Sequence, residues 1–266
     1  MPIANYRLYR CAVAGIEGID LTSTRAFDRH THDQFGIGVV VSGAQKSASG
    51  RGMVEAGQGD VITFNPGEVH DGVPIDDKGR SWRMLYFAPD LIADALRDMT
   101  EGRTTSGEFE LPVVQDPALA ERFLQLFLAM TEASADLRRQ ELLTLVQASV
   151  LGRWRDSDRP QMTPGIAQAK ALIDDDPLTA HSLADLAKVG GLSRFQVLRA
   201  FAKATGLTPH AYLVQRRTDL ARRLIASGTP LAEAAAGAGF ADQSHMNRVF
   251  ARRYGYPPGA YAAAVN

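Results

Sequence analysis

Cysteine and long apolar runs are what this sequence lacks most clearly. Cys11 is the single cysteine among 266 residues, so an intramolecular disulfide and a thiolate-built metal cage are both excluded. No apolar run approaches the roughly 20 residues that a membrane-spanning helix needs. The first ten residues show neither a basic stretch followed by an apolar core nor a small-residue cleavage site. These absences predict a cytoplasmic protein with no membrane partner.

Net charge is also nearly absent, at −1 for the whole chain, but it is unevenly distributed. From Pro160 onward there are 12 Lys and Arg against 7 Asp and Glu, whereas the first 159 residues hold 17 basic and 23 acidic residues. A basic C-terminal half behind an acidic N-terminal half is expected if only the C-terminal half meets a polyanion. Uneven surface charge without any partner explains the same asymmetry.

The N-terminal part, up to residue 87, consists of short β-prone runs separated by glycine-bearing turns. Strands are predicted at residues 36–41 (GIGVVV), 60–64 (DVITF) and 83–87 (RMLYF). Many short strands at this spacing favour a small barrel or sandwich.

The apolar period then changes to that of helices. Asp116-Pro117 has the pattern of a helix start, and the apolar residues that follow recur at three- and four-residue steps. They are Leu119, Phe123, Leu126, Phe127 and Met130. A second helix carries Leu137, Leu142, Leu145, Val146 and Val150. This hairpin either packs only on the β domain or also forms a dimer contact.

Residues 156–165 (DSDRPQMTPG) are polar, contain two prolines and have no apolar period, which predicts a linker. The expected domains are therefore residues 1–155, the linker 156–165, and residues 166–266. The fold class is α+β with two domains. The first domain is a β-barrel with a helical hairpin, and the second is all helical.

The C-terminal domain contains an internal repeat with an offset of 49 residues. The matched pairs are Ala187/Ala236, Gly190/Gly239, Arg199/Arg248, Phe201/Phe250, Gly206/Gly255, Pro209/Pro258 and Tyr212/Tyr261. Ser193 and Asp242, both good N-caps, also coincide. So many matches in one register indicate two copies of one unit.

Each copy has the layout of a helix-turn-helix. A short helix with a small residue inside it (Ala187, Ala236) is followed by a glycine turn and a second helix, at about 193–205 and about 242–254. The second helix of such a unit enters the DNA major groove. Between the copies a helix from Pro209 to about Ser227 is predicted, roughly 28 Å long at 1.5 Å per residue. Because successive major-groove faces are about 34 Å apart, this helix could set two recognition helices one turn apart.

These residues resemble the AraC/XylS family of bacterial transcription regulators. Residues 238–250 (AGFADQSHMNRVF), followed by Gly255-Tyr256-Pro257-Pro258, are similar to the family signature, and residues 183–201 (LADLAKVGGLSRFQVLRAF) fit it in the first copy. The resemblance implies a sequence-specific DNA-binding regulator that is not an enzyme. Double-stranded DNA is its main partner, RNA polymerase is a further one, and a homodimer is expected.

The residues expected to face DNA are the non-core positions of the two recognition helices. In the first helix they are Arg194, Phe195, Gln196, Leu198, Arg199 and Lys203. In the second they are Gln243, Ser244, His245, Asn247 and Arg248. Leu198 either touches a thymine methyl or only packs. A further group of arginines is better placed for phosphate contacts or internal pairing: Arg216, Arg217, Arg222, Arg223, Arg252 and Arg253.

Histidines mark the expected site of the first domain. His30 and His32 should lie on one face of a strand because side chains alternate, and His70 follows a strand and a Pro-Gly turn. Residues 12–90 resemble the cupin-type sensor domain common in the same family, which implies an effector pocket inside the barrel. The expected pocket residues are His30, His32, Glu68, His70, Trp82 and Tyr86.

Three roles remain open for the histidines. They hydrogen-bond an organic effector, bind a divalent metal through His30, His32 and His70, or serve structure alone. Metal-binding cupins carry a glutamate soon after the paired histidines, but Gly36, Ile37 and Gly38 stand there, and Glu68 is the substitute on offer. No cofactor is therefore required, and an amino or organic acid is the expected effector. The rival functions are a metal-dependent cupin enzyme fused to a DNA-binding domain and a pure dimerisation module.

Overall fold

The N-terminal unit is organised around β4 (Phe35–Ser49), a long strand that pairs with different strands along its two halves. Its first half pairs antiparallel with β6 (Val61–Phe64) and β8 (Arg80–Phe87). Its second half pairs with β5 (Gly52–Gly57) and β7 (His70–Pro74). Residues 35–40 are all buried, which explains why this stretch is apolar without alternation. The three strands predicted from sequence lie in β4, β6 and β8.

The computed structural model describes residues 5–132, 134–152, 154–155 and 162–265. The chain divides into two units, Met1–Asp158 and Arg159–Asn266. The predicted linker falls largely on residues 156–161, which lie outside the described residues. The second unit's first helix begins at Pro164, two residues before the predicted domain start, because proline is favoured at the first helical position.

The main sheet of the N-terminal unit has the strand order β1-β2-β8-β4-β6-β10. Its edge strands β1 and β10 do not pair with each other among the described residues, so the sheet stays open and does not close into the expected barrel. The expected α+β class with two domains is otherwise confirmed. The remaining strands are β1 (Asn5–Arg10), β2 (Ile16–Ser23), β3 (Phe27–His30), β9 (Glu108–Phe109), β10 (Val113–Val114) and β11 (Trp154–Arg155).

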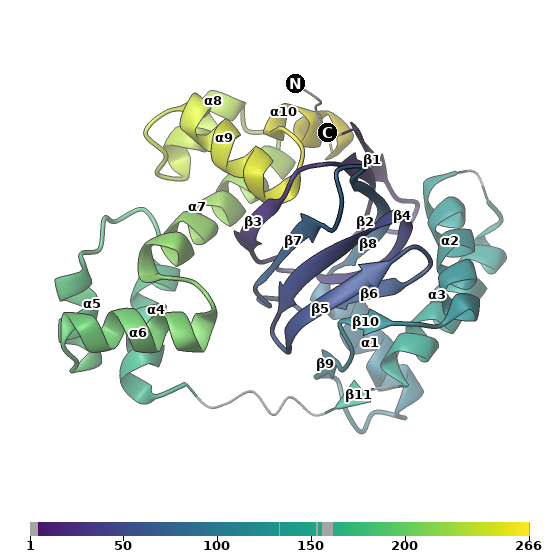
Figure 1. Ribbon diagram of the computed structural model, residues 1–266, viewed down its shortest axis with the longest axis horizontal. Coiled ribbons are helices and arrows are strands. Elements are labelled where there is room, and N and C mark those ends of the chain that lie inside the picture. The colour runs from purple at the N-terminus through teal and green to yellow at the C-terminus, as the bar shows by residue number, and fades with distance from the viewer. Residues whose placement is uncertain (1–4, 133, 153, 156–161, 266) are drawn as a thin grey trace. The chain divides into compact units, whose positions relative to one another are not determined.

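Two antiparallel helices, α2 (Pro117–Thr131) and α3 (Asp136–Leu151), form the predicted hairpin and lie against one side of this sheet (Figure 1). α2 begins as expected, since the Asp116 carboxylate accepts a hydrogen bond from the Leu119 amide at 3.0 Å. All five apolar residues predicted to face one side of α2 are buried. A helix missed from the sequence, α1 (Pro89–Met99), adds Ile92 and Leu96 to the same core.

The second helix of the hairpin is less completely buried than its sequence suggested. Leu142, Val146 and Val150 join the core, but Leu137 is 78% exposed and Leu145 is 42% exposed. Part of the apolar surface of α3 therefore faces away from its own unit.

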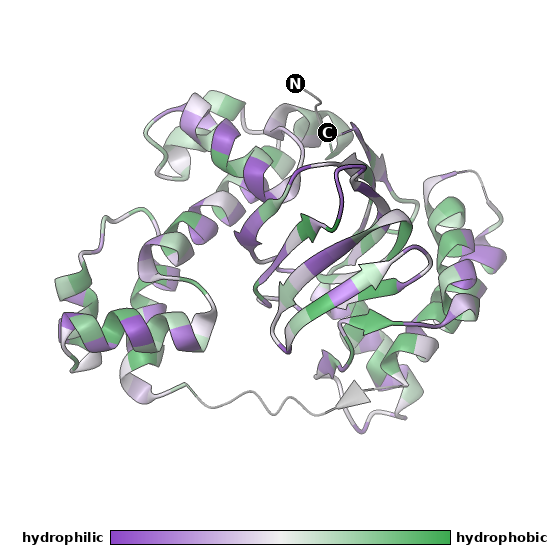
Figure 2. Cartoon of the chain, in the orientation of Figure 1, coloured by the Kyte–Doolittle hydropathy of each residue, from purple (hydrophilic) through white to green (hydrophobic). Residues whose placement is uncertain are grey.

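The C-terminal unit is entirely helical, and its amphipathic helices show hydrophilic and hydrophobic residues side by side (Figure 2). None of the helices described is long and apolar enough to cross a membrane. The helices are α4 (Pro164–Asp175), α5 (Leu183–Gly190), α6 (Arg194–Thr205), α7 (Pro209–Ala226), α8 (Leu231–Gly237), α9 (Gln243–Tyr254) and α10 (Pro258–Val265).

The repeat explains where α6 and α9 begin and end. Ser193 and Asp242 each accept a hydrogen bond from the amide three residues later, as N-caps do. Both helices stop at a glycine with positive φ, 75° at Gly206 and 82° at Gly255. The predicted helix boundaries are confirmed, as is the connecting helix α7 with Thr208 as its cap.

Candidate functional site

In the first helix-turn-helix unit, the apolar side of α6 packs inside the unit and the opposite side is exposed. Val197 and Phe201 are fully buried, and the Phe201 ring packs edge-on against Tyr212 of α7, with the ring centroids 5.4 Å apart. Phe195 and Leu198, two apolar residues predicted to face DNA, are 65% and 39% exposed. The six residues predicted to face DNA are all exposed: Arg194, Phe195, Gln196, Leu198, Arg199 and Lys203.

Not all six are equivalent. The Arg199 guanidinium lies 5.4 Å from the Phe195 ring centroid, so an aromatic face supports this arginine. The side-chain oxygen of Gln196 accepts from the Ser193 amide and completes a capping box. Leu198 borders a cavity of about 320 Å³ behind the helix, with Leu186 and Leu213 among its walls. This position favours the packing role for Leu198.

The second recognition helix, α9, presents a smaller open surface. Ser244 and Arg248 are exposed, while Gln243, His245 and Asn247 are half-buried. The His245 ring packs edge-on against Phe240, with the ring centroids 5.4 Å apart. The sequence had suggested full exposure for these residues, but the short α8 and the turn after it cover one edge of the helix.

Four of the six additional arginines are engaged inside the C-terminal unit. Arg216 contacts the carboxylates of Asp174 and Asp219, and Arg217 donates to the carbonyls of Pro177 and Leu178. Arg253 is buried and donates to Gln215, and Arg222 lies over the Tyr254 and Tyr261 rings. Internal pairing was one of the two predicted roles and holds for these four. Arg223 and Arg252 are exposed on the surface of the unit.

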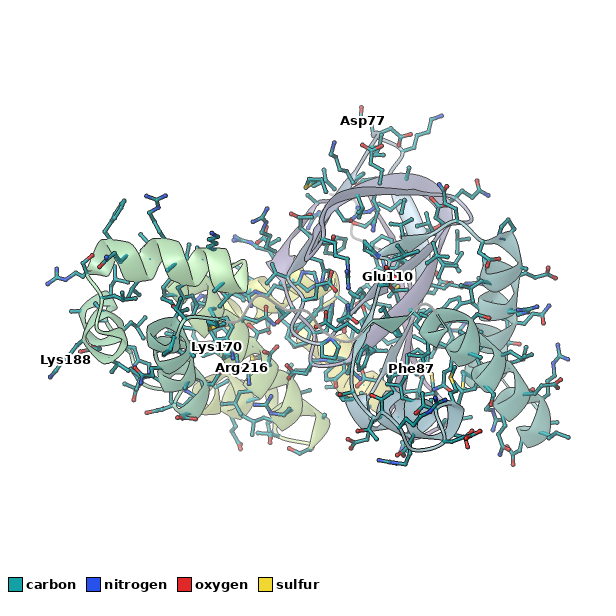
Figure 3. The ribbon with its side chains drawn as sticks, turned by 90° about the horizontal axis from the view of Figure 1, so that it is seen from below. Asp77, Phe87, Glu110, Lys170, Lys188 and Arg216 are labelled. Carbon is teal, nitrogen blue, oxygen red and sulfur yellow. The ribbon has the colours of Figure 1, made fainter. Side chains whose placement is uncertain are left out.

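Arg216 and Arg253 belong to a polar network that runs along α7 and joins this helix to α4 and to α9 of the second copy. Asp174 on α4 meets Arg216, and Figure 3 shows Arg216 close to Lys170, which contacts the same carboxylate. Asp219 accepts hydrogen bonds from Gln215 at 2.7 Å and from the Tyr254 hydroxyl of α9 at 3.2 Å. Burial, followed by the Asp219 charge, raises the pKa of Tyr254 well above its usual value. This network was not predicted, because the helices that it joins are far apart along the chain.

The three histidines of the N-terminal unit converge, although not as predicted. His30 ends β3, but His32 lies beyond the strand, in the connection to β4, and not on the same strand face. The Nε2 atoms of His30 and His32 are nevertheless 3.2 Å apart. His70 begins β7 directly opposite His30 in the antiparallel pairing. One ring nitrogen from each of the three lies within 4.8 Å of the others.

Backbone carbonyls and aromatic rings fix these imidazoles. His30 Nδ1 is 2.8 Å from the Asp28 carbonyl, and His70 Nδ1 is 3.1 Å from the Glu68 carbonyl. The Phe64 ring stacks on His32 and on His70 at 5.0 and 4.5 Å. Burial lowers the pKa of His70, while the Glu68 carbonyl and the charges of Glu68 and Asp71 act in the opposite direction.

Phe64 was not among the pocket residues predicted from the sequence. Its place beside the histidines depends on the glycines of β4. Gly36 is the cross-strand partner of Phe64, and a Cβ on Gly36 would fall 2.1 Å from the Phe64 ring. At Gly38 a Cβ would fall 1.8 Å from Met84 Sδ. The glycines that replace the expected glutamate therefore make room for side chains of neighbouring strands.

Of the other expected pocket residues, one lies in the histidine cluster and two make contacts elsewhere. The Tyr86 ring lies 4.9 Å from His32 and belongs to the cluster. Trp82 packs edge-on against Phe27, under the Arg80 guanidinium. Glu68 does not supply a carboxylate to the histidines. Its two oxygens accept from the Gly50 amide and from the amide and side chain of Asn65.

Comparison with known proteins matches both units. Residues 13–146 match the family described as the AraC-like ligand binding domain, and residues 186–264 match a helix-turn-helix domain. The chain belongs to the AraC family of transcriptional regulators. Among AraC-family relatives, the uncharacterized regulator YbfI of Bacillus subtilis is 27% identical over 83% of this chain and 81% of its own. The transcriptional activator NphR of Rhodococcus is 30% identical over 64% of this chain and 42% of its own.

The fold of this AraC-family chain is also similar to that of a solved structure. The unsaturated fatty acid-bound structure of ToxT from Vibrio cholerae matches with a TM-score of 0.58, covering 99% of this chain and 96% of ToxT, at 13% identity. The chain is thus a transcriptional regulator with a ligand-binding domain and a DNA-binding helix-turn-helix domain.

Proposed function

We propose that this regulator inserts α6 and α9 into successive major grooves of one DNA duplex, under the control of a small organic acid bound in the N-terminal unit. The observation that carries the DNA half is the duplicated unit. Both helices have an N-cap, a buried apolar side and a solvent-facing arginine at the matched positions Arg199 and Arg248.

The helix between the copies supports the two-groove arrangement. α7 has 18 residues, which at 1.5 Å per residue gives about 27 Å. Neighbouring major-groove faces are about 34 Å apart. The length of α7, with the width of the two units added to it, can therefore separate α6 and α9 by one helical turn of DNA. The polar network through α7 holds the copies in a fixed relation.

Selection of binding sites from random duplexes with the full chain tests this proposal. We expect a two-part motif whose halves are separated by about 10–10.5 base pairs centre to centre. Arg199→Ala should relax one half of the motif and Arg248→Ala the other. A one-part motif that both variants relax at the same bases would contradict the two-groove arrangement.

The effector half of the proposal stands on the histidine cluster. Imidazole and phenol groups enclosed by Phe64 and its neighbours provide a few polar contacts in an apolar setting, as ligand pockets do. An acid suits imidazole groups because they can donate hydrogen bonds to a carboxylate. The known ligands of the ToxT structures, an unsaturated fatty acid and a naphthalenyl butenoic acid, are also carboxylic acids. We propose sensing and not catalysis, because the relatives are transcriptional regulators.

We further propose that the chain forms a homodimer through α3 and contacts RNA polymerase when bound at a promoter. Leu137 and Leu145 of α3 and Leu128 of α2 are exposed apolar side chains on the helical hairpin, and a second copy of the same hairpin would cover them. Replacing Leu137 with lysine should shift the sedimentation coefficient from dimer to monomer while thermal stability stays unchanged, because Leu137 has few contacts in its own unit. Unchanged sedimentation would place the dimer contact elsewhere.

A further inference from the structure

The organic effector proposed above does not account for how closely the three histidines approach each other. A carboxylate would be served by one or two imidazole donors at separate points of a pocket. Here one ring nitrogen from each of three histidines, on β3, in the following connection and on β7, lies within 4.8 Å of the other two. Three imidazole nitrogens this close together suit a cation bound between them.

We infer that His30, His32 and His70 bind one divalent transition-metal ion in the ligand pocket. The metal site itself depends only on the histidine geometry. Its influence on effector and DNA binding rests on the function proposed above. It makes the N-terminal unit a metal-containing sensor in which the effector meets the ion.

The distances fit such an ion. Zn²⁺ binds imidazole nitrogen at about 2.0–2.1 Å in tetrahedral sites, which places two ligand nitrogens about 3.3–3.4 Å apart. The His30 and His32 Nε2 atoms are 3.2 Å apart already. All three ligand nitrogens lie within 4.8 Å of one another. Side-chain movements of about 1.5 Å or less would therefore bring every pair of nitrogens to the separation found around one Zn²⁺.

The groups around the histidines also fit. A carbonyl oxygen only accepts, so the contacts to the Asp28 and Glu68 carbonyls place a proton on Nδ1 of His30 and His70. In a neutral ring the lone pair is then on Nε2, and for His30 this is the atom that lies 3.2 Å from Nε2 of His32. A second ring nitrogen held by a backbone carbonyl is the usual support of a metal-binding histidine. Stacking with Phe64 and His70 keeps His32 in the same orientation.

The donor set selects the kind of ion. Three imidazoles without a carboxylate suit Zn²⁺, Co²⁺, Ni²⁺ or Cu²⁺ and disfavour Mg²⁺ and Ca²⁺, which prefer oxygen ligands. Among the described residues no carboxylate or thiol joins the three histidines, since Glu68 is bound to Gly50 and Asn65 and Phe64 occupies the space beside Gly36. Water or a donor atom of the effector takes the fourth position, as in open zinc sites.

Metal titration of the full chain tests this inference. After chelator treatment and dialysis, the chain is titrated with Co²⁺ or Zn²⁺ and followed by native mass spectrometry, elemental analysis and visible absorption. We expect one ion per chain. The bound Co²⁺ should show the strong visible bands of a four-coordinate ion, whereas hydrated Co²⁺ shows only weak bands. His30→Gln, His32→Gln and His70→Gln should each weaken binding by at least the roughly 100-fold that loss of an outer-shell partner can cause.

His210→Gln is the matched control, since His210 is an exposed histidine on α7 outside the cluster, and it should bind the ion like the unaltered chain. Circular dichroism verifies the fold of each variant, and the Co²⁺ spectrum of the unaltered chain decides the question if a variant does not fold. No uptake by the folded chain, or unchanged uptake by a folded His70→Gln variant, would overturn the inference. DNA binding is measured separately by site selection, so failure of the metal site leaves the proposed DNA recognition standing, and the reverse also holds.

Discussion

Replacing Arg248 with alanine is expected to lower the affinity for the selected DNA site by roughly 10- to 100-fold, consistent with about 1–3 kcal/mol for an arginine that contacts a guanine through two hydrogen bonds. Arg248 is exposed on α9, between the buried residues Met246 and Phe250. Its removal therefore takes away a DNA contact without opening the core. Binding to unrelated DNA should change little, so the specific complex approaches the nonspecific one. Fluorescence anisotropy with selected and scrambled duplexes measures both.

Arg252→Ala is the control for this prediction, since Arg252 is an exposed arginine in the last turn of the same helix. If it contacts phosphate, its loss should weaken binding to all sequences alike and reduce the salt dependence by about one unit of slope. Equal losses of sequence preference in both variants would mean that Arg248 does not read a base. An unchanged Arg248→Ala complex would remove this residue from the interface.

Replacing Asp219 with alanine is expected to destabilise the C-terminal unit by about 3–5 kcal/mol, the range found when one partner of a buried charged network is removed. Asp219 is 5% exposed and accepts hydrogen bonds from Gln215, Arg216 and Tyr254. Alanine leaves the tyrosine hydroxyl, the amide and a charged guanidinium without this acceptor inside the unit. Denaturant unfolding monitored by circular dichroism gives the loss.

Asp175→Ala serves as the matched comparison, because Asp175 is an exposed aspartate at the end of α4 and should change stability by less than about 0.5 kcal/mol. Asp219→Asn keeps an acceptor oxygen and should recover part of the stability. If Asp219→Ala unfolds at the same denaturant concentration as the unaltered chain, the network does not hold the two copies of the repeat together. If it is less stable but still selects the two-part DNA motif, α7 alone sets the spacing.

The DNA-binding half was largely predictable because its signals are local. N-caps, C-terminal glycines and prolines act within one helical turn, so Ser193, Asp242, Gly206 and Gly255 mark α6 and α9 directly in the sequence. The 49-residue offset then repeats those signals. The degree of burial along each helix was less predictable: Phe195 and Leu198 are apolar, yet they are 65% and 39% exposed.

The histidine cluster shows the opposite case. The sequence indicated that His30, His32 and His70 belong together, but it placed His32 on a strand and offered Glu68 as a ligand. The turn of the chain after β3 and the hydrogen bonds from Gly50 and Asn65 decided otherwise. Gly36 could be understood only once β6 was seen to pair with β4 and to bring Phe64 over it.

The sequence by itself therefore determined the helix ends, the duplicated helix-turn-helix and the class of the protein, because each depends on residues within a few positions of one another or on a repeat. The tertiary structure alone decided which arginines pair internally, which leucines of α3 stay exposed and how three histidines meet. Those outcomes depend on contacts between segments far apart in the chain, and hydrophobic period and turn signals carry no information about which distant segment arrives at a given face.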